Sequence, residues 1–262
     1  AGHQVVGIGQ RPHAGLDPGV EVAYGPLSAE ALGALTDAAD TVIHLSPVEH
    51  GVAESAGIMG LVHMANAAAR SGTRLLLPVH SAGDRELYAQ AAELVSSSWG
   101  PTVVVRMAPL IGRLGDWAVG RTVATLMNTE HGTSGPIRLL HVDDLCRFLA
   151  HAVFSDRTGT VDLASTDTVT YVSARRRLGE TRVRRGLPIW PVTDPEFRLV
   201  PLHRDWGFEC GWAPLDAVAD AALALAGHRL DDAGVPAVTV AAPTVGVPAA
   251  PEVGGADGRD AL

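Results

Sequence analysis

The chain has 262 residues, enough for one large α/β domain with a smaller addition, and its hydrophobic fraction of 47% excludes wholesale disorder. A net charge of -9 speaks against non-specific nucleic-acid binding, which needs a basic surface. No segment resembles a membrane span or a signal peptide, and the two cysteines do not make a disulfide framework. We therefore expect a cytoplasmic protein that binds neither membranes nor nucleic acid.

Lysine is absent from the sequence, because all 20 basic residues are arginine. This absence excludes a Schiff-base lysine, a Walker A phosphate loop and a lysine-containing catalytic pair within the chain. Any catalysis by these residues must therefore use other side chains.

Short apolar runs alternate with segments of helical periodicity in the first half of the chain. The expected strands are residues 5–8, 20–23, 41–45, 75–79 and 102–106, and the expected helices are residues 28–37, 52–70 and 85–97. The first of these helices begins at Ser28, a good capping residue, with Glu30 in its first turn. Strands separated by amphipathic helices predict βαβ units and a mostly parallel sheet.

The second half of the chain is less regular. We expect helices over residues 117–127, 143–154 and 213–226, and an extended run over residues 137–142. The predicted organisation is a core of residues 1–157, a smaller lobe of residues 158–228 and a flexible Ala/Pro/Gly linker of residues 229–262. The linker, together with a first residue that is not methionine, leads us to expect a multidomain protein with a neighbouring domain.

A glycine pair follows the first expected strand, at residues 7–9 (Gly-Ile-Gly). A dinucleotide fingerprint would need a third glycine and a helix start, but Pro12 stands at the glycine position and the residues after it cannot begin that helix. We therefore do not expect a phosphate-binding loop here.

Six short segments occur in an order that is typical of one known superfamily. They are residues 1–7 (Ala-Gly-His-Gln-Val-Val-Gly), 25–27 (Gly-Pro-Leu), 39–46 (Ala-Asp-Thr-Val-Ile-His-Leu-Ser), 79–82 (Val-His-Ser-Ala), 105–112 (Val-Arg-Met-Ala-Pro-Leu-Ile-Gly) and 141–145 (His-Val-Asp-Asp-Leu). In this order they resemble the extended short-chain dehydrogenase/reductase superfamily, the NAD-dependent epimerase/dehydratase group, from residue 1 to about residue 228.

The resemblance implies a Rossmann-like doubly wound parallel sheet with a small C-terminal substrate-type lobe. It also implies that the chain is N-terminally truncated and lacks the first βα unit, which would carry the glycine-rich pyrophosphate turn. The positions that match cofactor-lining segments of the family are Leu27, Leu45, Ser46, Pro47 and Pro109.

The residue at the end of the family's second strand selects the nicotinamide cofactor. A carboxylate there accepts a hydrogen bond from the ribose 2′-OH of NAD, whereas an arginine accommodates the 2′-phosphate of NADP. This chain has Arg11 and no acidic residue before Asp17, so we expect NADP, with NAD as the less favoured cofactor. The alternative is that Arg11 is a solvated turn residue.

The family's chemistry uses a tyrosine base, a lysine four residues later and a serine or threonine that polarises the substrate. Ser81 and Tyr88 match the serine and the tyrosine, but the lysine position holds Ala92. A phenol with a pKa near ~10 stays protonated at neutral pH without such help.

Two hypotheses follow from these catalytic positions. The favoured one is a catalytically degenerate cofactor-binding or scaffold domain, in which Tyr88 is a structural ring on a helix flank. The alternative is an active NADP-dependent oxidoreductase or epimerase on a nucleotide-sugar-like substrate.

Two further groups of polar residues have a functional and a structural interpretation. His141, Asp143 and Asp144 could bind a metal, but further ligands are missing, and helix capping by Asp143 explains the spacing. Cys146 is expected to be a small core residue of the same helix. The arginines at positions 175–177, 182, 184 and 185 could bind an anionic small-molecule substrate, although an exposed basic helix face is the preferred interpretation.

Overall fold

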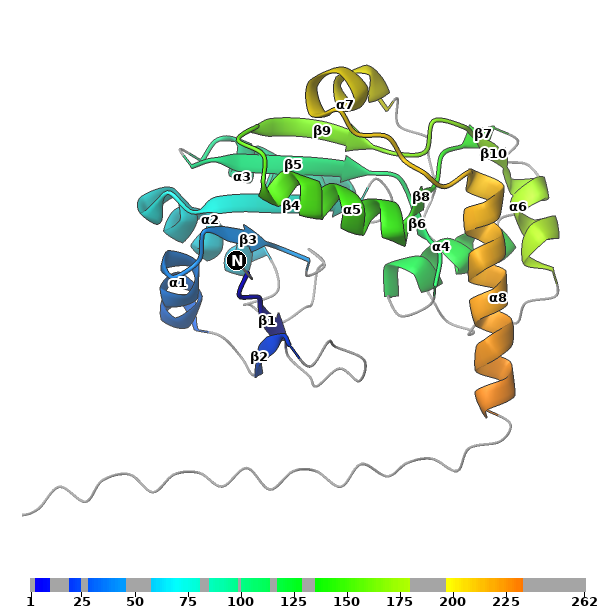
Figure 1. Cartoon of the computed structure of the whole chain (residues 1–262), viewed down its shortest axis with the longest axis horizontal. Coiled ribbons are helices and arrows are strands. Elements are labelled where there is room, and N and C mark those ends of the chain that lie inside the picture. Colours follow the sequence, from blue (N-terminus) through cyan, green and yellow to red (C-terminus); the bar gives the residue numbers. More distant parts are fainter. Residues whose placement is uncertain are drawn as a thin grey trace, which may run out of the picture.

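The computed structural model describes residues 3–9, 19–24, 28–45, 58–80, 85–98, 100–113, 117–128, 135–179 and 197–232. Within them the chain forms an α/β fold built on a parallel sheet, as the alternation of strands and helices predicts (Figure 1). No helix in these ranges is long and apolar enough to cross a membrane.

The main sheet has four parallel strands in the order β3-β4-β5-β9. They are β3 (Thr41–Ile43), β4 (Arg74–His80), β5 (Thr102–Met107) and β9 (Gly159–Leu163). Every residue of β4 is buried. The continuous apolar sequence of β4 and β5 is typical of strands that are covered on both faces.

Alternate residues of β4 contribute to separate hydrophobic clusters. Leu76 packs in one cluster with α5 (Val142–Val153), whereas Leu75 and Leu77 pack in the other with α2 (Ile58–Ser71) and α3 (Arg85–Ser96). Successive side chains of a strand point to opposite faces, so the two clusters lie on opposite faces of the sheet. Helices therefore cover both faces, and the predicted doubly wound architecture is confirmed.

The N-terminal strands form a separate parallel sheet of two strands, β1 (Val6–Gly9) and β2 (Glu21–Tyr24). Helix α1 (Ala29–Asp37) follows β2 and leads to β3 (Figure 1). Ser28 caps this helix as predicted, since its hydroxyl accepts a hydrogen bond from the backbone N–H of Ala31 at 3.2 Å.

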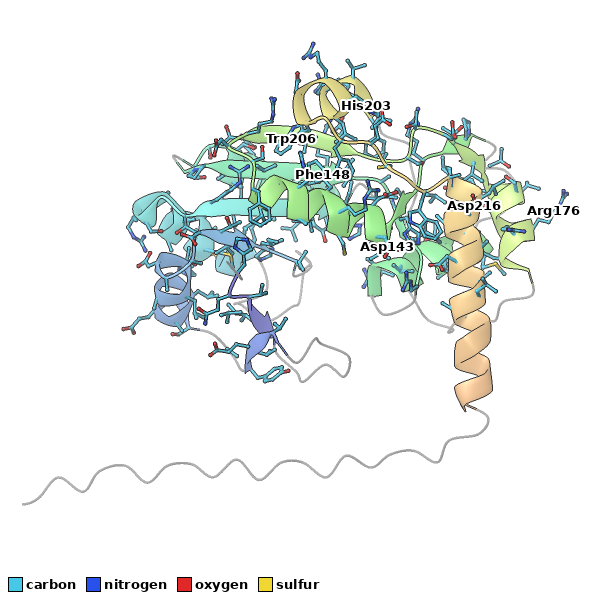
Figure 2. All side chains as sticks on the ribbon, viewed as in Figure 1. Asp143, Phe148, Arg176, His203, Trp206 and Asp216 are labelled. Atoms are coloured by element: carbon cyan, nitrogen blue, oxygen red, sulfur yellow. The ribbon has the colours of Figure 1, made fainter. Side chains whose placement is uncertain are left out.

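The remaining elements lie beyond the carboxyl end of β5 and around β9. They are β6 (Leu110–Ile111), α4 (Trp117–Asn128), β7 (Pro136–Ile137), β8 (Leu140–His141), β10 (Val169–Thr170), α6 (Tyr171–Leu178), α7 (Leu199–Trp206) and α8 (Pro214–Asp232). Strand β6 pairs with β8 in parallel and β7 with β10 in antiparallel orientation. The fully buried ring of Phe148 on α5 packs against Trp206 at 5.2 Å and Phe208 at 5.1 Å between ring centroids, which joins α7 to the main core (Figure 2).

A bidentate ion pair crosses from β5 to β9. Arg106 donates to both carboxylate oxygens of Asp162 at 2.6 and 2.7 Å, and these residues are direct neighbours in the strand register. Asp162 also accepts a hydrogen bond from the backbone N–H of Arg198 at 2.7 Å. The buried carboxylate therefore holds the segment that leads into α7 against the sheet.

The structure differs from the sequence prediction at several positions in the second half. Residues 137–142 are not one extended run, because β7 and β8 are short and α5 begins at Val142. Strand β9 falls in the range predicted for the smaller lobe but pairs with β5 in the main sheet. Helix α8 runs to Asp232 and so passes the predicted start of the linker at residue 229. The prediction of Cys146 as a core residue is wrong, since α5 turns this side chain to solvent.

Candidate functional site

The carboxyl ends of β3, β4 and β5 lie at the same end of the main sheet, because these strands are parallel neighbours. We call this end, where the strands stop, the carboxyl edge. The residues at this edge are His44 and Leu45 after β3, His80 at the end of β4, and Ala108 and Pro109 after β5. Leu45 is 66% exposed, whereas the two histidines and Pro109 are buried. Ligands of open α/β sheets bind outside the carboxyl ends of the strands, so this edge is the candidate site.

Two buried histidines follow or end neighbouring strands at this edge, His44 directly after β3 and His80 at the end of β4, where its register partner is Met107 of β5. Burial lowers the pKa of His44 to about 4, and burial together with the positive charge of Arg121 lowers the pKa of His80 to about 4. The backbone N–H of His44 donates to the carbonyl oxygen of Leu76 at 3.0 Å. Both imidazoles are therefore neutral at pH 7, and they contribute polarity but no positive charge to the edge.

The predicted catalytic tyrosine lies beside this edge. Tyr88 is in the first turn of α3, and its ring is 6.2 Å from the ring of His80, edge to face. The tyrosine is only 3% exposed and belongs to the cluster that contains Leu77 and Val104. This placement suits the structural role of Tyr88, and a role in proton transfer stays a prediction.

The other predicted site residues divide between the described and undescribed parts of the chain. Leu45 and Pro109 lie at the carboxyl edge, as the family resemblance implies for cofactor-lining positions. Five of the predicted residues lie outside the described residues: Arg11, Leu27, Ser46, Pro47 and Ser81. The proposed contacts of all these residues with a cofactor stay predictions.

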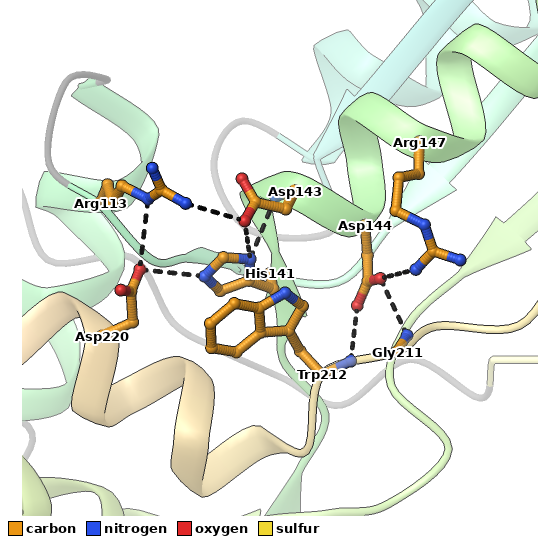
Figure 3. A network of polar contacts seen from close by, with 8 residues as sticks. All are labelled: Arg113, His141, Asp143, Asp144, Arg147, Gly211, Trp212 and Asp220. Carbon is orange, nitrogen blue, oxygen red and sulfur yellow. Dashed lines mark hydrogen bonds and ion pairs between the residues drawn. The ribbon is translucent and has the colours of Figure 1, made fainter.

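A polar network surrounds His141 at the start of α5 (Figure 3). The fully buried imidazole accepts a hydrogen bond at Nδ1 from the backbone N–H of Asp143 at 3.1 Å, and its Nε2 is 3.1 Å from a carboxylate oxygen of Asp220 on α8. Because Nδ1 accepts, the proton lies on Nε2, which donates to Asp220. The ring of Trp212 stacks on the imidazole with centroids 3.8 Å apart.

This geometry corrects the prediction that Asp143 caps α5. The N-cap is His141, and Asp143 lies in the first helical turn, where its carboxylate is 3.2 Å from the guanidinium of Arg113. The glycine before this arginine, Gly112, has a φ of +132°, and a Cβ there would lie 2.7 Å from His141 Nε2. Gly112 is therefore required for the close approach of the imidazole to β6.

Asp144 makes a second set of contacts in the same network (Figure 3). Its carboxylate accepts hydrogen bonds from the backbone N–H groups of Gly211 and Trp212 at 2.9 and 3.1 Å, and from Arg147 at 2.7 Å. The residue is 1% exposed. The adjacent aspartates thus differ in role. Asp144 holds the backbone of the segment before α8 by hydrogen bonds, whereas Asp143 lies nearer the surface.

Sequence reasoning missed the partners in this network, namely Arg113, Trp212 and Asp220. None of them stands at a helical or strand spacing from His141, and Asp220 is 79 residues away in sequence. The described residues contain no group of three or more metal-ligating side chains.

The arginines of α6 mostly lie at the surface. Arg176 and Arg177 are exposed, and Figure 2 shows Arg176 on the outer side of the molecule. Arg175 is half-buried, and its Nε donates to the carbonyl oxygen of Leu126 at 3.4 Å. The exposed pair follows the preferred interpretation of a basic helix face, and the arginines at 182, 184 and 185 lie outside the described residues.

No protein-family model and no curated protein sequence matches the chain. Solved structures do match. The Bordetella bronchiseptica enzyme WbmG, in complex with NAD, aligns with a TM-score of 0.61 and 15% identity over 87% of each chain. UDP-glucose 4-epimerase of Thermotoga maritima with UDP-glucose aligns with a TM-score of 0.66 and 12% identity over 87% of this chain and 92% of the other. The chain has the fold of the UDP-sugar 4-epimerases.

A third structure agrees with this result. The Thermus thermophilus UDP-glucose 4-epimerase complex with NAD aligns with a TM-score of 0.60 and 14% identity, over 81% of this chain and 86% of that one. The predicted resemblance to the extended short-chain dehydrogenase/reductase superfamily is thereby confirmed for the fold.

Proposed function

We propose that this chain is a nicotinamide-dinucleotide-binding domain of the epimerase type that has lost turnover. The observation that carries the proposal is the sheet topology. Among the described residues the β1–β2 sheet is not hydrogen-bonded to β3, and the carboxyl ends of β3, β4 and β5 lie together at one end of the main sheet. Such switch points are where doubly wound folds bind dinucleotides. The exposed Leu45 and the buried Pro109 are the described residues that would line the cofactor.

The loss of turnover follows from the residues around Tyr88. The position four residues later is Ala92, and the sequence has no lysine that could replace the missing ammonium group. The tyrosine is also nearly inaccessible in the described structure, with 3% exposure. A neutral phenol that substrate does not reach is a poor general base.

A second candidate function is an active oxidoreductase or epimerase on a nucleotide-sugar-like substrate. It is favoured by the contact of the Tyr88 ring with the ring of His80. His80 ends β4, and the nicotinamide would bind beside the carboxyl end of this strand. It is also supported by the solved complexes of WbmG with NAD and UDP and of WbmF with NAD+ and UDP. In this reading Ser81 polarises the substrate oxygen and Tyr88 transfers the proton.

The choice of nicotinamide cofactor is the finer part of the proposal. Arg11 favours NADP, because a guanidinium forms a bidentate pair with the 2′-phosphate, whereas the Thermus thermophilus epimerase and WbmG structures contain NAD. A charge-assisted hydrogen bond of about 1.5–3 kcal/mol would give NADP a preference on the order of ten- to a hundredfold. The neighbouring domain and the cytoplasmic location remain part of the same proposal.

The deciding experiment is a calorimetric titration of the full-length protein with NADP and with NAD. Weak NADP binding is the expected result, with neither net reduction of the nicotinamide nor formation of an epimerised sugar when UDP-sugars are added. Arg11→Ala should remove the preference for NADP, and Arg70→Ala, which removes an exposed arginine at the end of α2, should leave it unchanged.

Other results would redirect the proposal. Turnover that Tyr88→Phe abolishes would establish the second candidate function instead. Equal affinities for the two nucleotides would remove Arg11 from the site, and the binding of neither would leave a scaffold domain.

A further inference from the structure

The described side chains at the carboxyl edge are apolar or uncharged. Ala108 and Pro109 are buried after β5, and Leu45 after β3 is 66% exposed. The other side chains at this edge are His44 and His80, and burial lowers the pKa of each imidazole to about 4, so both are neutral at pH 7. A ligand group that binds here therefore leaves water for a surface whose described side chains offer it no counter-charge.

A positive charge acts on this edge from helix α4. Figure 1 shows α4 beyond the carboxyl ends of the main strands. The helix carries the half-buried Arg121, whose guanidinium charge lowers the pKa of His80 in the same direction as burial does. No carboxylate of the described residues contributes to the pKa shift of either His44 or His80, and Glu86 in the first turn of α3 is exposed to water. Among the described side chains, the charge that acts at the end of β4 is therefore positive.

The two redox forms of a nicotinamide ring differ by one charge. The oxidised ring is a cation and the dihydro form is neutral, whereas the rest of the dinucleotide is the same in both. Moving a cation from water to a surface without a counter-charge costs free energy. A like charge nearby adds repulsion, which is stronger in a site of low dielectric constant than in water. Both effects weaken the binding of the oxidised form and leave the binding of the reduced form unchanged.

We propose that the carboxyl edge selects the reduced dinucleotide, because the uncharged dihydronicotinamide ring suits neutral side chains beside Arg121 and the cationic ring does not. This inference rests on the proposed function, since it names the redox form of the cofactor that the same site takes. In this role the domain responds to the ratio of reduced to oxidised nucleotide, and it does so without transferring a hydride itself.

The test is a calorimetric titration of the full-length protein at pH 7 with NADPH and, separately, with NADP+. NADPH should bind at least about tenfold more tightly than NADP+. Equal affinities, or tighter binding of NADP+, would overturn this inference and leave the proposed function standing. The binding of neither nucleotide would overturn both, so the two failures are distinguishable.

A negative charge placed at the edge tests the electrostatic cause. Leu45→Asp adds a carboxylate at an exposed position and should lower the ratio of NADPH affinity to NADP+ affinity at least about fivefold. Leu45→Asn has a similar shape without the charge and is the matched control, because any affinity that it loses should be lost equally for both nucleotides. The same affinity ratio in the Asp and Asn variants would contradict the proposal.

Removal of the positive charge is the complementary test. Arg121→Gln should lower the affinity ratio at least about threefold. Arg176→Gln, a change at an exposed position of α6, is the matched control and should leave the ratio unchanged. A folded Arg121→Gln protein with the wild-type ratio would contradict the assignment of the charge to Arg121. The pair of Leu45 variants decides the question if Arg121→Gln does not fold.

Discussion

Strands β1 (Val6–Gly9) and β4 (Arg74–His80) both have apolar centres but lie in different environments. Both are short apolar runs in parallel sheets, yet Leu75, Leu76 and Leu77 of β4 are 0% exposed, whereas Val6 and Ile8 of β1 are 43% and 47% exposed. Strand β4 has a strand on each edge and a hydrophobic cluster on each face, whereas β1 has one strand neighbour among the described residues. The comparison teaches that an apolar strand is stabilised by its neighbours. Mutations in the two strands should therefore lower the free energy of unfolding by very different amounts.

The largest expected difference is between truncations in the two strands. Leu77→Ala should lower the free energy of unfolding by about 2–5 kcal/mol, because it leaves a cavity at a fully buried position. Ile8→Ala should lower it by less than about 1 kcal/mol, because the side chain is half exposed. Urea unfolding of both variants at pH 7 measures the difference. Equal costs would show that β1 is as well packed as β4.

A second expected effect is acid destabilisation through the buried histidines at the carboxyl ends of β3 and β4. His44 and His80 have a pKa of about 4 in the folded protein and 6.5 when unfolded, so the unfolded chain binds more protons between these values. The free energy of unfolding is therefore unaffected by these histidines above pH 6.5. It falls as the pH drops from 6.5 towards 4, by up to about 3 kcal/mol for each residue.

Unfolding of His44→Gln and His80→Gln at pH 7 and pH 4.5 tests this effect. Each variant should lose less stability on acidification than the wild type. His3→Gln, at an exposed position, is the control and should behave as the wild type does. An identical loss in all four proteins would contradict the assignment.

The neighbouring aspartates of α5 allow a matched comparison within the well-packed region. Asp144→Asn should lower the free energy of unfolding by about 1–3 kcal/mol, since the buried carboxylate accepts from two backbone N–H groups and Arg147. Asp143→Asn should cost less than about 1 kcal/mol, because its pair with Arg113 is partly solvent-exposed. Thermal or urea unfolding of the two variants would show whether the cost follows burial.

The smallest expected effect concerns the cap of α1, which follows β2 in the chain. Ser28→Ala removes the hydroxyl that accepts from Ala31 and should cost about 0.5–1 kcal/mol. Ser28→Asp keeps an acceptor and should restore the stability. A loss well above this range would mean that α1 is coupled to the core more tightly than its exposed cap indicates.

Local patterns predicted the elements of the sheet well. The predicted helix at residues 85–97 is α3 (Arg85–Ser96), and the predicted strand at residues 102–106 is β5 (Thr102–Met107). The resemblance of six short segments to the extended dehydrogenases also predicted the fold. Sequence identity to the matching solved structures is only 12–15%, so the comparison of structures confirmed this prediction. These features depend on side-chain periodicity and on residues close together in sequence.

The tertiary structure decided the features that depend on distant partners. The cap of α5 is His141 and not Asp143, because Trp212 and Asp220 hold the imidazole in place from the other end of the chain. The continuous apolar sequence of β4 indicated its burial, whereas the exposure of Val6 and Ile8 on β1 was not indicated by the apolar residues of that strand. Periodicity along a chain specifies which side of an element is apolar, whereas burial and polar contacts depend on what packs against that side.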